Sequence, residues 1–174
     1  MIGGRSIDGG IDEIPLPVPA GRLWLCGKHV VGPGPEAVLD RVGATTIVCL
    51  NQTHELTDRY PDYVEWLRHN TPGRVVWFPT PDLSMRAFPE SHPFLMDLIE
   101  RLQKREGLIV HCAAGIGRSG TTATALLMLL GVDSTAALDT VARHRPMAGP
   151  EAGSQRGFIE ELQTRLSSGG RRET

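Results

Sequence analysis

Two kinds of hydrophobic pattern alternate along this chain: short apolar runs and apolar residues at helical spacing. Short apolar runs, several rich in β-branched residues, are typical of strands; they lie at residues 22–26, 45–50, 74–78 and 108–111. Apolar residues at helical spacing predict six helices; these lie at residues 35–42, 62–69, 90–105, 118–130, 134–144 and 154–166. Strands that alternate with helices predict an α/β fold, with a central, mainly parallel sheet flanked by helices.

The 174 residues suffice for one domain with a sizeable core. We expect this domain to span residues 21–166. Residues 1–20 contain three prolines within five positions and predict an extended or disordered N-terminal arm, and residues 167–174 predict a polar tail. No internal repeat or second domain is evident in the sequence.

Composition narrows the function classes. Hydrophobic residues make up 40% of the chain and charged residues 22%, as in globular proteins. The net charge of −2 argues against a nucleic-acid partner or an anionic membrane bound through bulk charge. The longest apolar stretch, residues 123–132, is too short to span a bilayer, and the N-terminus lacks a signal pattern. We therefore expect a cytoplasmic protein; the pattern indicates no particular oligomeric state.

The positions of the cysteines and histidines argue against a disulfide-stabilised or metal-binding protein. Cys26, Cys49 and Cys112 leave one cysteine unpaired in any disulfide scheme, and none forms a C-x-x-C pair, which favours a reduced intracellular protein. The six histidines show no metal-ligand spacing, so we expect neither a metal nor another cofactor. Cys49, at a strand end, is a candidate to trap oxidised Cys112 as a disulfide, although a buried core cysteine is the commoner case.

The strongest chemical signal is HCAAGIGRSG at residues 111–120, between an expected strand and an expected helix. On such a turn, backbone N–H groups converge and the helix dipole favours negative charge. A buried cysteine followed by a surface arginine is the ordinary interpretation of C-x5-R alone, but this context favours an anion site. We expect a phosphate-binding loop formed by Ala113, Ala114, Gly115, Ile116, Gly117 and Arg118.

The residue types in this loop point to nucleophilic chemistry. Near a helix N-terminus and an arginine, cysteine pKa values fall to roughly 3.5–7.5, so we expect Cys112 to attack as a thiolate. The planar guanidinium of Arg118 matches two phosphate oxygens at once. Ser119 can donate its hydroxyl to the sulfur and ease departure of the thiolate. We expect His111 to orient the loop by hydrogen bonds rather than to act as an acid or base.

This segment resembles the active-site loop of the cysteine-dependent protein tyrosine phosphatase superfamily, and the short chain is most similar to its compact dual-specificity branch. The resemblance covers roughly residues 21–165 and is strongest at 108–121. It implies a protein tyrosine phosphatase-like fold and a metal-independent hydrolase that forms a phosphocysteine intermediate. The implied partner is a phosphorylated protein carrying phosphotyrosine, and also phosphoserine or phosphothreonine for dual specificity.

Two further residues gain roles from this resemblance. In WFPTPDLS, residues 77–84, two prolines end a strand and Asp82 follows. The resemblance implies that Asp82 is the general acid; otherwise an aspartate that caps a turn is common. Asp62 and Asp97 compete less well, because each lies in a helical pattern. In MAGPEAGSQ, residues 147–155, Gln155 matches a glutamine that positions water for hydrolysis, whereas a surface glutamine at a helix start is the plain alternative.

The sequence leaves other functions open. A phosphatase of a non-protein substrate, such as a phosphoinositide or an RNA 5′ end, would use the same loop, but uncharged Ala113, Ala114 and Ile116 disfavour the phosphoinositide. A rhodanese-like sulfurtransferase would use the cysteine and leave Asp82 and Gln155 idle. A non-catalytic phosphate-binding module would be expected to lose the cysteine, the arginine or the acid, and this chain has all three.

Overall fold

The computed structural model describes residues 10–169, and a five-stranded sheet runs through the middle of this part of the chain. The strands are β1 (Ile11–Ile14), β2 (Arg22–Gly27), β3 (Thr46–Cys49), β4 (Val75–Trp77) and β5 (Gly107–Cys112). Their order is β1-β2-β5-β3-β4; the last four are parallel, and β1 pairs antiparallel with β2 at one edge. The predicted mainly parallel sheet is therefore confirmed.

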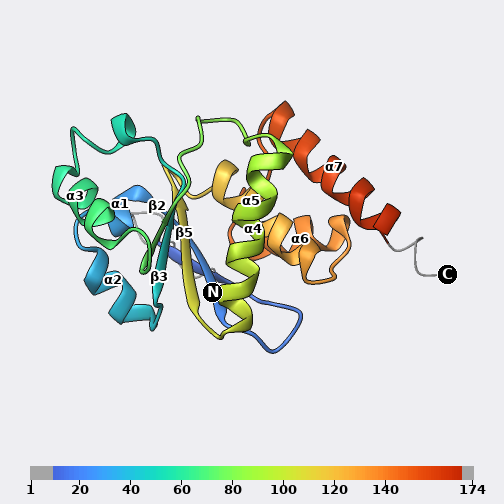
Figure 1. The fold of residues 1–174 in the computed structure, drawn as a ribbon, viewed down its shortest axis with the longest axis horizontal. Helices are drawn as coiled ribbons and strands as arrows, with labels where there is room; N and C mark the ends of the chain where they lie inside the picture. The colour runs from blue at the N-terminus through green and yellow to red at the C-terminus, as the bar shows by residue number, and fades with distance from the viewer. Residues whose placement is uncertain (1–9, 170–174) are drawn as a thin grey trace.

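Helices cover both faces of the sheet (Figure 1). One layer contains α1 (Lys28–Val31), α2 (Pro35–Val42) and α3 (Pro61–Asn70), and a short 3-10 turn, η1 (Thr53–Glu55), lies on the same side. The other layer contains α4 (Phe88–Gln103), α5 (Gly117–Leu129), α6 (Ser134–His144) and α7 (Gly153–Gly169). The protein is thus a three-layer α/β structure.

The central strand β5 divides the core in two. All six of its residues are buried, and successive side chains point to opposite faces of the sheet. Leu108 and Val110 pack in the cluster under α4 and α5, whereas Ile109 packs in the cluster under α2 and α3. A short apolar strand buried on both sides explains why its sequence showed a continuous run rather than an alternation.

Every strand and helix predicted from the periodicities is present, with bounds shifted by at most a few residues. Three elements are additional: β1, α1 and η1. The expected arm over residues 1–20 contributes β1 to the sheet, and Ile14 is only 1% exposed. With four residues, β1 is too short for its period-2 pattern to predict a strand. Its pairing with β2 stabilises it. The expected tail over residues 167–174 begins inside α7; residues 1–9 and 170–174 lie outside the described part.

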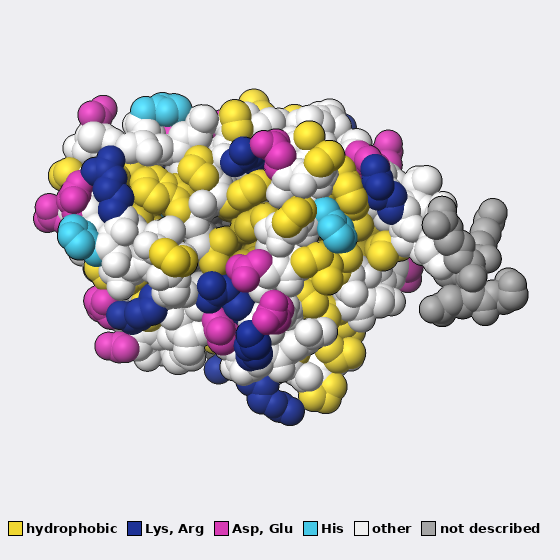
Figure 2. All heavy atoms as spheres, in the orientation of Figure 1, with side chains coloured by type: hydrophobic (Ala, Val, Ile, Leu, Met, Phe, Trp, Pro, Cys, Tyr) yellow, Lys and Arg dark blue, Asp and Glu magenta, His cyan; other side chains and the backbone are white. Residues whose placement is uncertain are grey.

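On the face that Figure 2 shows, basic and acidic side chains are interspersed rather than gathered in an area of one sign. Within residues 10–169, no helix is long and apolar enough to cross a membrane.

The start of α5 packs against the loop that joins α6 to α7. A Cβ placed on Gly120 would lie 2.1 Å from the backbone N of Gly149, and all residues of α5 from Gly117 to Met128 are buried. This contact fixes the end of the helix that follows Cys112. A side chain at position 120 would force backbone apart from backbone.

We expect Gly120→Ala to lower the free energy of unfolding by about 1–3 kcal/mol, because overpacking against backbone strains the core. Gly157→Ala is the matched control: it lies inside α7 with nothing within 4 Å of its Cβ position. That variant should gain roughly 0.5–1 kcal/mol from helix propensity. Urea denaturation followed by circular dichroism measures both; an equal response of the two variants would refute the close contact.

Candidate active site

The HCAAGIGRSG segment lies where the parallel strands end. Residues 113–116 link the end of β5 to the start of α5, at the upper edge of the sheet in Figure 1. β2 and β3 flank β5 and run parallel to it, so their carboxyl ends meet at the same edge. In α/β sheets this edge is where ligands bind.

The four carbonyls of residues 113–116 all bind groups outside this turn. The donors are Lys28 N to Ala113 O (3.1 Å), Arg145 Nη2 to Ala114 O (2.8 Å), Arg145 Nε to Gly115 O (2.7 Å), and Gly120 N and Gly149 N to Ile116 O (2.9 and 3.1 Å). In a planar trans peptide the N–H points opposite to the C=O. The amides that follow these carbonyls therefore face the interior of the turn and form a concave nest suited to an anion.

Two features hold this turn in shape. Arg145, 2% exposed, also forms an ion pair with Asp12 of β1 at 2.7 Å, so the edge strand and the end of α6 brace the turn together. Gly115 has φ +71, and a Cβ there would lie 2.3 Å from Cys26 O. Only glycine fits both the backbone angle and the space. Arg143, by contrast, is exposed and pairs with Asp139.

Arg118 is buried beside this nest. Its Nη1 donates to Glu55 Oε2 and to Thr80 O, each at 2.8 Å, and its Nη2 donates to Glu55 Oε1 at 2.8 Å. The Asp82 carboxylate lies 3.4 Å from Nη2. Within the described residues Nε has no partner, although Arg118 is only 2% exposed. One donor of the guanidinium is thus left for a ligand.

Glu55 is a site residue that the sequence analysis did not identify. Burial opposes its ionisation, but hydrogen bonds from Arg118 and from the Gln52 N–H outweigh burial and lower its pKa from 4.5 to about 2. The available signal was the spacing Gln52-x-x-Glu55 after a buried strand, which indicates a capping box. The pairing with Arg118, 63 residues away, has no local signature.

Asp82 stands at the exposed rim. Its side chain is 67% exposed, and its Oδ1 accepts the Leu83 N–H at 2.9 Å in a turn where Leu83 has φ +57. The next residues of this loop contact α7, since the Met85 N–H donates to Ser154 Oγ at 3.3 Å. The structure therefore brings Asp82 to Arg118, whereas Asp62 lies on α3 and Asp97 on α4; the general-acid function of Asp82 stays a prediction.

His111 and Cys112 come directly before the turn and Ser119 lies in the first turn of α5; all three are buried. Within the described residues Ser119 Oγ has no partner. His111 Nε2 lies 2.7 Å from Tyr63 Oη, and its Nδ1 lies 3.4 Å from Cys112 O. Burial lowers the pKa of His111 from 6.5 to about 4, so the ring is neutral at neutral pH. The orienting function expected of His111 stays a prediction.

Gln155 joins two segments rather than facing outward. It is fully buried; its Oε1 accepts the Glu151 N–H at 2.8 Å, and its Nε2 donates to Ser84 O at 3.3 Å. Both ends of the amide therefore have protein partners. The residue connects the start of α7 to the loop that carries Asp82.

Cys26 and Cys49 are buried in the core cluster under α2 and α3, while Cys112 belongs to the cluster on the other side of the sheet. All three thiols are free. Burial raises the pKa of Cys26 to about 12 and raises the pKa of Cys49 well above its usual range. Disulfide trapping of Cys112 by Cys49 stays a prediction.

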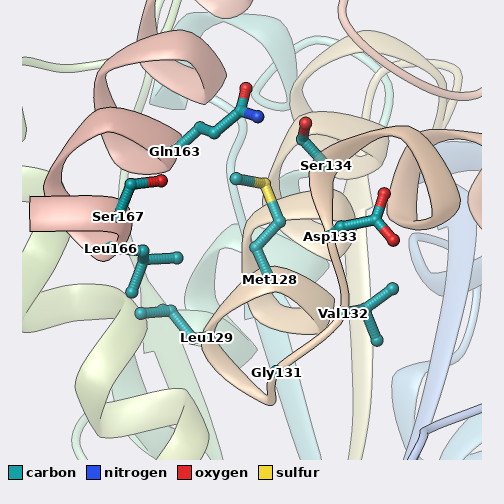
Figure 3. A pocket seen from close by; sticks show the side chains of 9 residues that line it. All are labelled: Met128, Leu129, Gly131, Val132, Asp133, Ser134, Gln163, Leu166 and Ser167. Atoms are coloured by element: carbon teal, nitrogen blue, oxygen red, sulfur yellow. The ribbon is translucent and has the colours of Figure 1, made fainter. Parts of the chain in front are cut away.

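Among residues 10–169, no three His, Cys, Asp or Glu side chains are grouped so that they could hold a metal ion. A hollow of about 400 Å³ opens between the end of α5, the start of α6 and α7 (Figure 3). It lies at the opposite end of α5 from Cys112, roughly 18 Å along the helix at 1.5 Å per residue.

Comparison with known proteins gives one family. A family model described as "PTP-SAK: Swiss Army Knife protein, DSP-PTPase phosphatase domain" matches residues 35–158, well over half of the chain. No curated protein matches the chain in sequence.

Several solved structures share the fold. The active form of Tk-PTP is 26% identical with a TM-score of 0.64, and the match covers 84% of this chain and 92% of that one. Kinase associated phosphatase (KAP) with its catalytic-site cysteine changed to serine is 20% identical, with a TM-score of 0.73 and coverage of 91% and 96%. PTPMT1 in complex with PI(5)P is 16% identical, with a TM-score of 0.68 and coverage of 85% and 94%.

The ion pair between Glu55 and Arg118 predicts a specific pH dependence of stability. Because its pKa is lower in the folded state, Glu55 stabilises the fold above about pH 4.5, and this contribution is lost as the pH falls toward 2. We expect Glu55→Gln to lower the free energy of unfolding at pH 7 by about 3 kcal/mol. The gap to the wild type should close between pH 4.5 and 2.

Denaturant titrations across this pH range measure the effect. Glu65→Gln is the control, because Glu65 pairs with Arg68 on the exposed face of α3, where an ion pair contributes about 0–1 kcal/mol. A gap between Glu55→Gln and wild type that stays constant down to pH 2 would contradict the lowered pKa.

Proposed function

The chain belongs to the PTP-SAK family of DSP-PTPase phosphatase domains, and from this premise we propose that it hydrolyses phosphomonoesters through a phosphocysteine on Cys112. The observation that supports this most is the nest at residues 113–116, whose carbonyls all bind outside it, with Cys112 directly before it. The free Nε of Arg118 adds a cationic donor beside the nest. These groups suit three phosphoryl oxygens.

In the first step, the phosphate is held by the amides of the turn and by Arg118. The Cys112 thiolate attacks phosphorus, the Sγ–P bond forms, and the P–O bond to the alcohol or phenol breaks. Asp82 gives its proton to the departing oxygen. Glu55, with a pKa of about 2, is ionised at neutral pH and cannot donate a proton, so among the two carboxyls near Arg118 the acid is Asp82.

In the second step, water attacks the phosphocysteine. The water oxygen bonds to phosphorus, the Sγ–P bond breaks, and the Asp82 carboxylate takes a proton from the water. Inorganic phosphate leaves, and Cys112 returns as a thiolate. The buried Ser119 hydroxyl, which has no other partner in the described residues, donates to the departing sulfur.

We propose a phosphorylated protein as substrate, with phosphotyrosine as the preferred residue and phosphoserine and phosphothreonine as further ones. Uncharged Ala113, Ala114 and Ile116 in the turn favour this over a phosphoinositide headgroup, which carries several anionic groups and suits a basic pocket. PTPMT1, bound to PI(5)P, shares the fold, so a lipid phosphate is the second candidate. The three free cysteines favour a reducing, cytoplasmic setting.

Sulfur transfer by Cys112 is the alternative chemistry. A sulfurtransferase needs no proton for a leaving alcohol, so its site has no use for a carboxylate beside the anion-binding arginine. Asp82, 3.4 Å from Arg118, favours ester hydrolysis instead.

We expect the wild type to hydrolyse an aryl phosphate in the presence of a chelator. Cys112→Ser should abolish turnover because the thiolate is lost, and Asp82→Asn should reduce kcat by roughly 10²–10⁴, the usual effect of removing a general acid. Asp62→Asn, an exposed aspartate at the start of α3, is the matched control and should leave kcat unchanged. Thiosulfate sulfurtransferase activity without phosphatase activity would overturn the proposal.

We expect kcat/KM for a phosphotyrosine peptide to exceed that for a phosphoserine peptide and for a soluble phosphoinositide by about tenfold or more. The phenol, with a pKa near 10, is a better leaving group than an alkyl alcohol. Phosphate release from the three substrates at equal concentration measures this. Preference for the phosphoinositide would replace the protein substrate by a lipid one.

A further inference from the structure

The two middle peptide groups of the phosphate-binding turn are held by a side chain rather than by backbone. At the two ends of the turn, the carbonyls of Ala113 and Ile116 accept hydrogen bonds from backbone N–H groups. The carbonyls of Ala114 and Gly115 instead accept hydrogen bonds from the guanidinium of Arg145, at 2.8 and 2.7 Å. The middle of the turn therefore depends on how this one side chain is placed.

Glycine makes the middle of the turn easy to deform. Gly115 has φ +71, and glycine adopts positive and negative φ about equally readily. Ala114 is exposed, so its side chain adds little packing that would fix the peptide group between the two residues. Rotation of this peptide group would turn a carbonyl oxygen into the nest in place of an N–H, and the oxygen would repel a phosphate. The anion site therefore needs an outside contact that fixes this orientation.

Asp12 fixes the plane of the Arg145 guanidinium. Its Oδ2 accepts a hydrogen bond from Nη1 at 2.7 Å, while Nη2 and Nε donate to the two carbonyls of the turn. A guanidinium is planar and rigid, so contacts at both of its ends define its orientation. The Arg145 side chain is 2% exposed and the Asp12 side chain is 32% exposed. A partly exposed carboxylate thus orients a buried cation, and this cation orients the turn.

This contact reaches the site from the edge of the sheet. Asp12 belongs to β1, which has four residues and, within the described part of the chain, pairs with β2 only. The next residue of the strand, Glu13, points to the opposite face and pairs with Arg22 of β2 at 2.7 Å, where both side chains are exposed. Two neighbouring carboxylates of one strand therefore differ in their partner: Asp12 binds the arginine of the turn, and Glu13 binds a surface arginine.

We propose that Asp12 is a positioning residue for phosphate binding: through Arg145 it keeps the N–H groups of Gly115 and Ile116 directed into the nest, and it couples the edge strand β1 to the anion site. This inference rests on the phosphate-binding turn of the proposed function. Asp12 acts through the position of its oxygen and not through its charge, because a negative charge near the nest would by itself weaken anion binding. The coupling is reciprocal, so a bound phosphate also strengthens the attachment of β1.

Titration with inorganic phosphate, followed through the amide NMR signals of Gly115 and Ile116, tests this without any turnover. We expect the dissociation constant for phosphate to rise about tenfold in Asp12→Ala, as for loss of one hydrogen bond, and the phosphate-induced shifts of the two amide signals to shrink. Asp12→Asn should bind phosphate as the wild type does, because its amide oxygen still accepts from Arg145 Nη1. Glu13→Ala is the matched control on the same strand and should leave the dissociation constant unchanged.

A second measurement uses the wild type alone, so it holds even where Asp12→Ala does not fold. Hydrogen exchange of the backbone is compared with and without saturating inorganic phosphate. We expect exchange of the amides in β1 to slow several-fold on phosphate binding, because the bound anion favours the state in which Asp12 holds Arg145. The amides of β4, the strand at the opposite edge of the sheet, are the reference and should slow much less. Circular dichroism verifies the fold of each variant in the titrations.

Three outcomes would overturn the inference: an unchanged dissociation constant in a folded Asp12→Ala variant, an Asp12→Asn variant that binds as weakly as Asp12→Ala, or equal slowing of exchange in β1 and β4. The first shows that Arg145 holds the turn without Asp12, the second that charge acts rather than position, and the third that strand and site are not coupled. A wild type that binds no phosphate would overturn the proposed function and the inference with it. A wild type that binds phosphate with these effects but hydrolyses no ester would overturn only the proposed function.

Discussion

The candidate site depends on the buried guanidinium of Arg145. A buried cation is stable only when its N–H groups find acceptors. Arg145 finds them in the Ala114 and Gly115 carbonyls and in Asp12, at distances of 2.7–2.8 Å. Because its N–H groups bind these two consecutive carbonyls on the outside of the turn, the amide N–H groups that follow them point to the interior of the turn. An edge strand, the end of a helix and the turn after the central strand therefore share one polar contact.

Carboxylates surround the site, and their environments give them different chemistry. The Glu55 side chain is largely buried and hydrogen-bonded by Arg118, which keeps it ionised and makes it a fixed support. Asp82 stands on an exposed turn, with its carboxylate 3.4 Å from Arg118. Glu151 rests on Gly117, next to the start of α5. The same functional group thus stands in different surroundings within one site, because burial and hydrogen-bond partners differ.

The architecture followed from local patterns because the main elements are long or strongly periodic. The continuous apolar run of β5 and the helical spacing of α4 each carry the signal of a buried element. β1 was not predicted, because four residues followed by Pro15 and Pro17 show too weak a period-2 alternation to indicate a strand. β1 is stabilised by its backbone hydrogen bonds to β2. This pairing depends on two segments together, so neither segment alone predicts it.

By itself the sequence predicted an anion-binding turn at residues 111–119, since a cysteine, two glycines and an arginine lie within one short segment between a strand and a helix. It also indicated Asp82 through the prolines before it and the family resemblance. Tertiary structure alone decided the partners that complete the site: Glu55 on Arg118, Arg145 on the turn, and Glu151 on Gly117. These contacts join residues 30 or more positions apart. Such pairings are set by how layers pack around the sheet, and no local period or propensity encodes them.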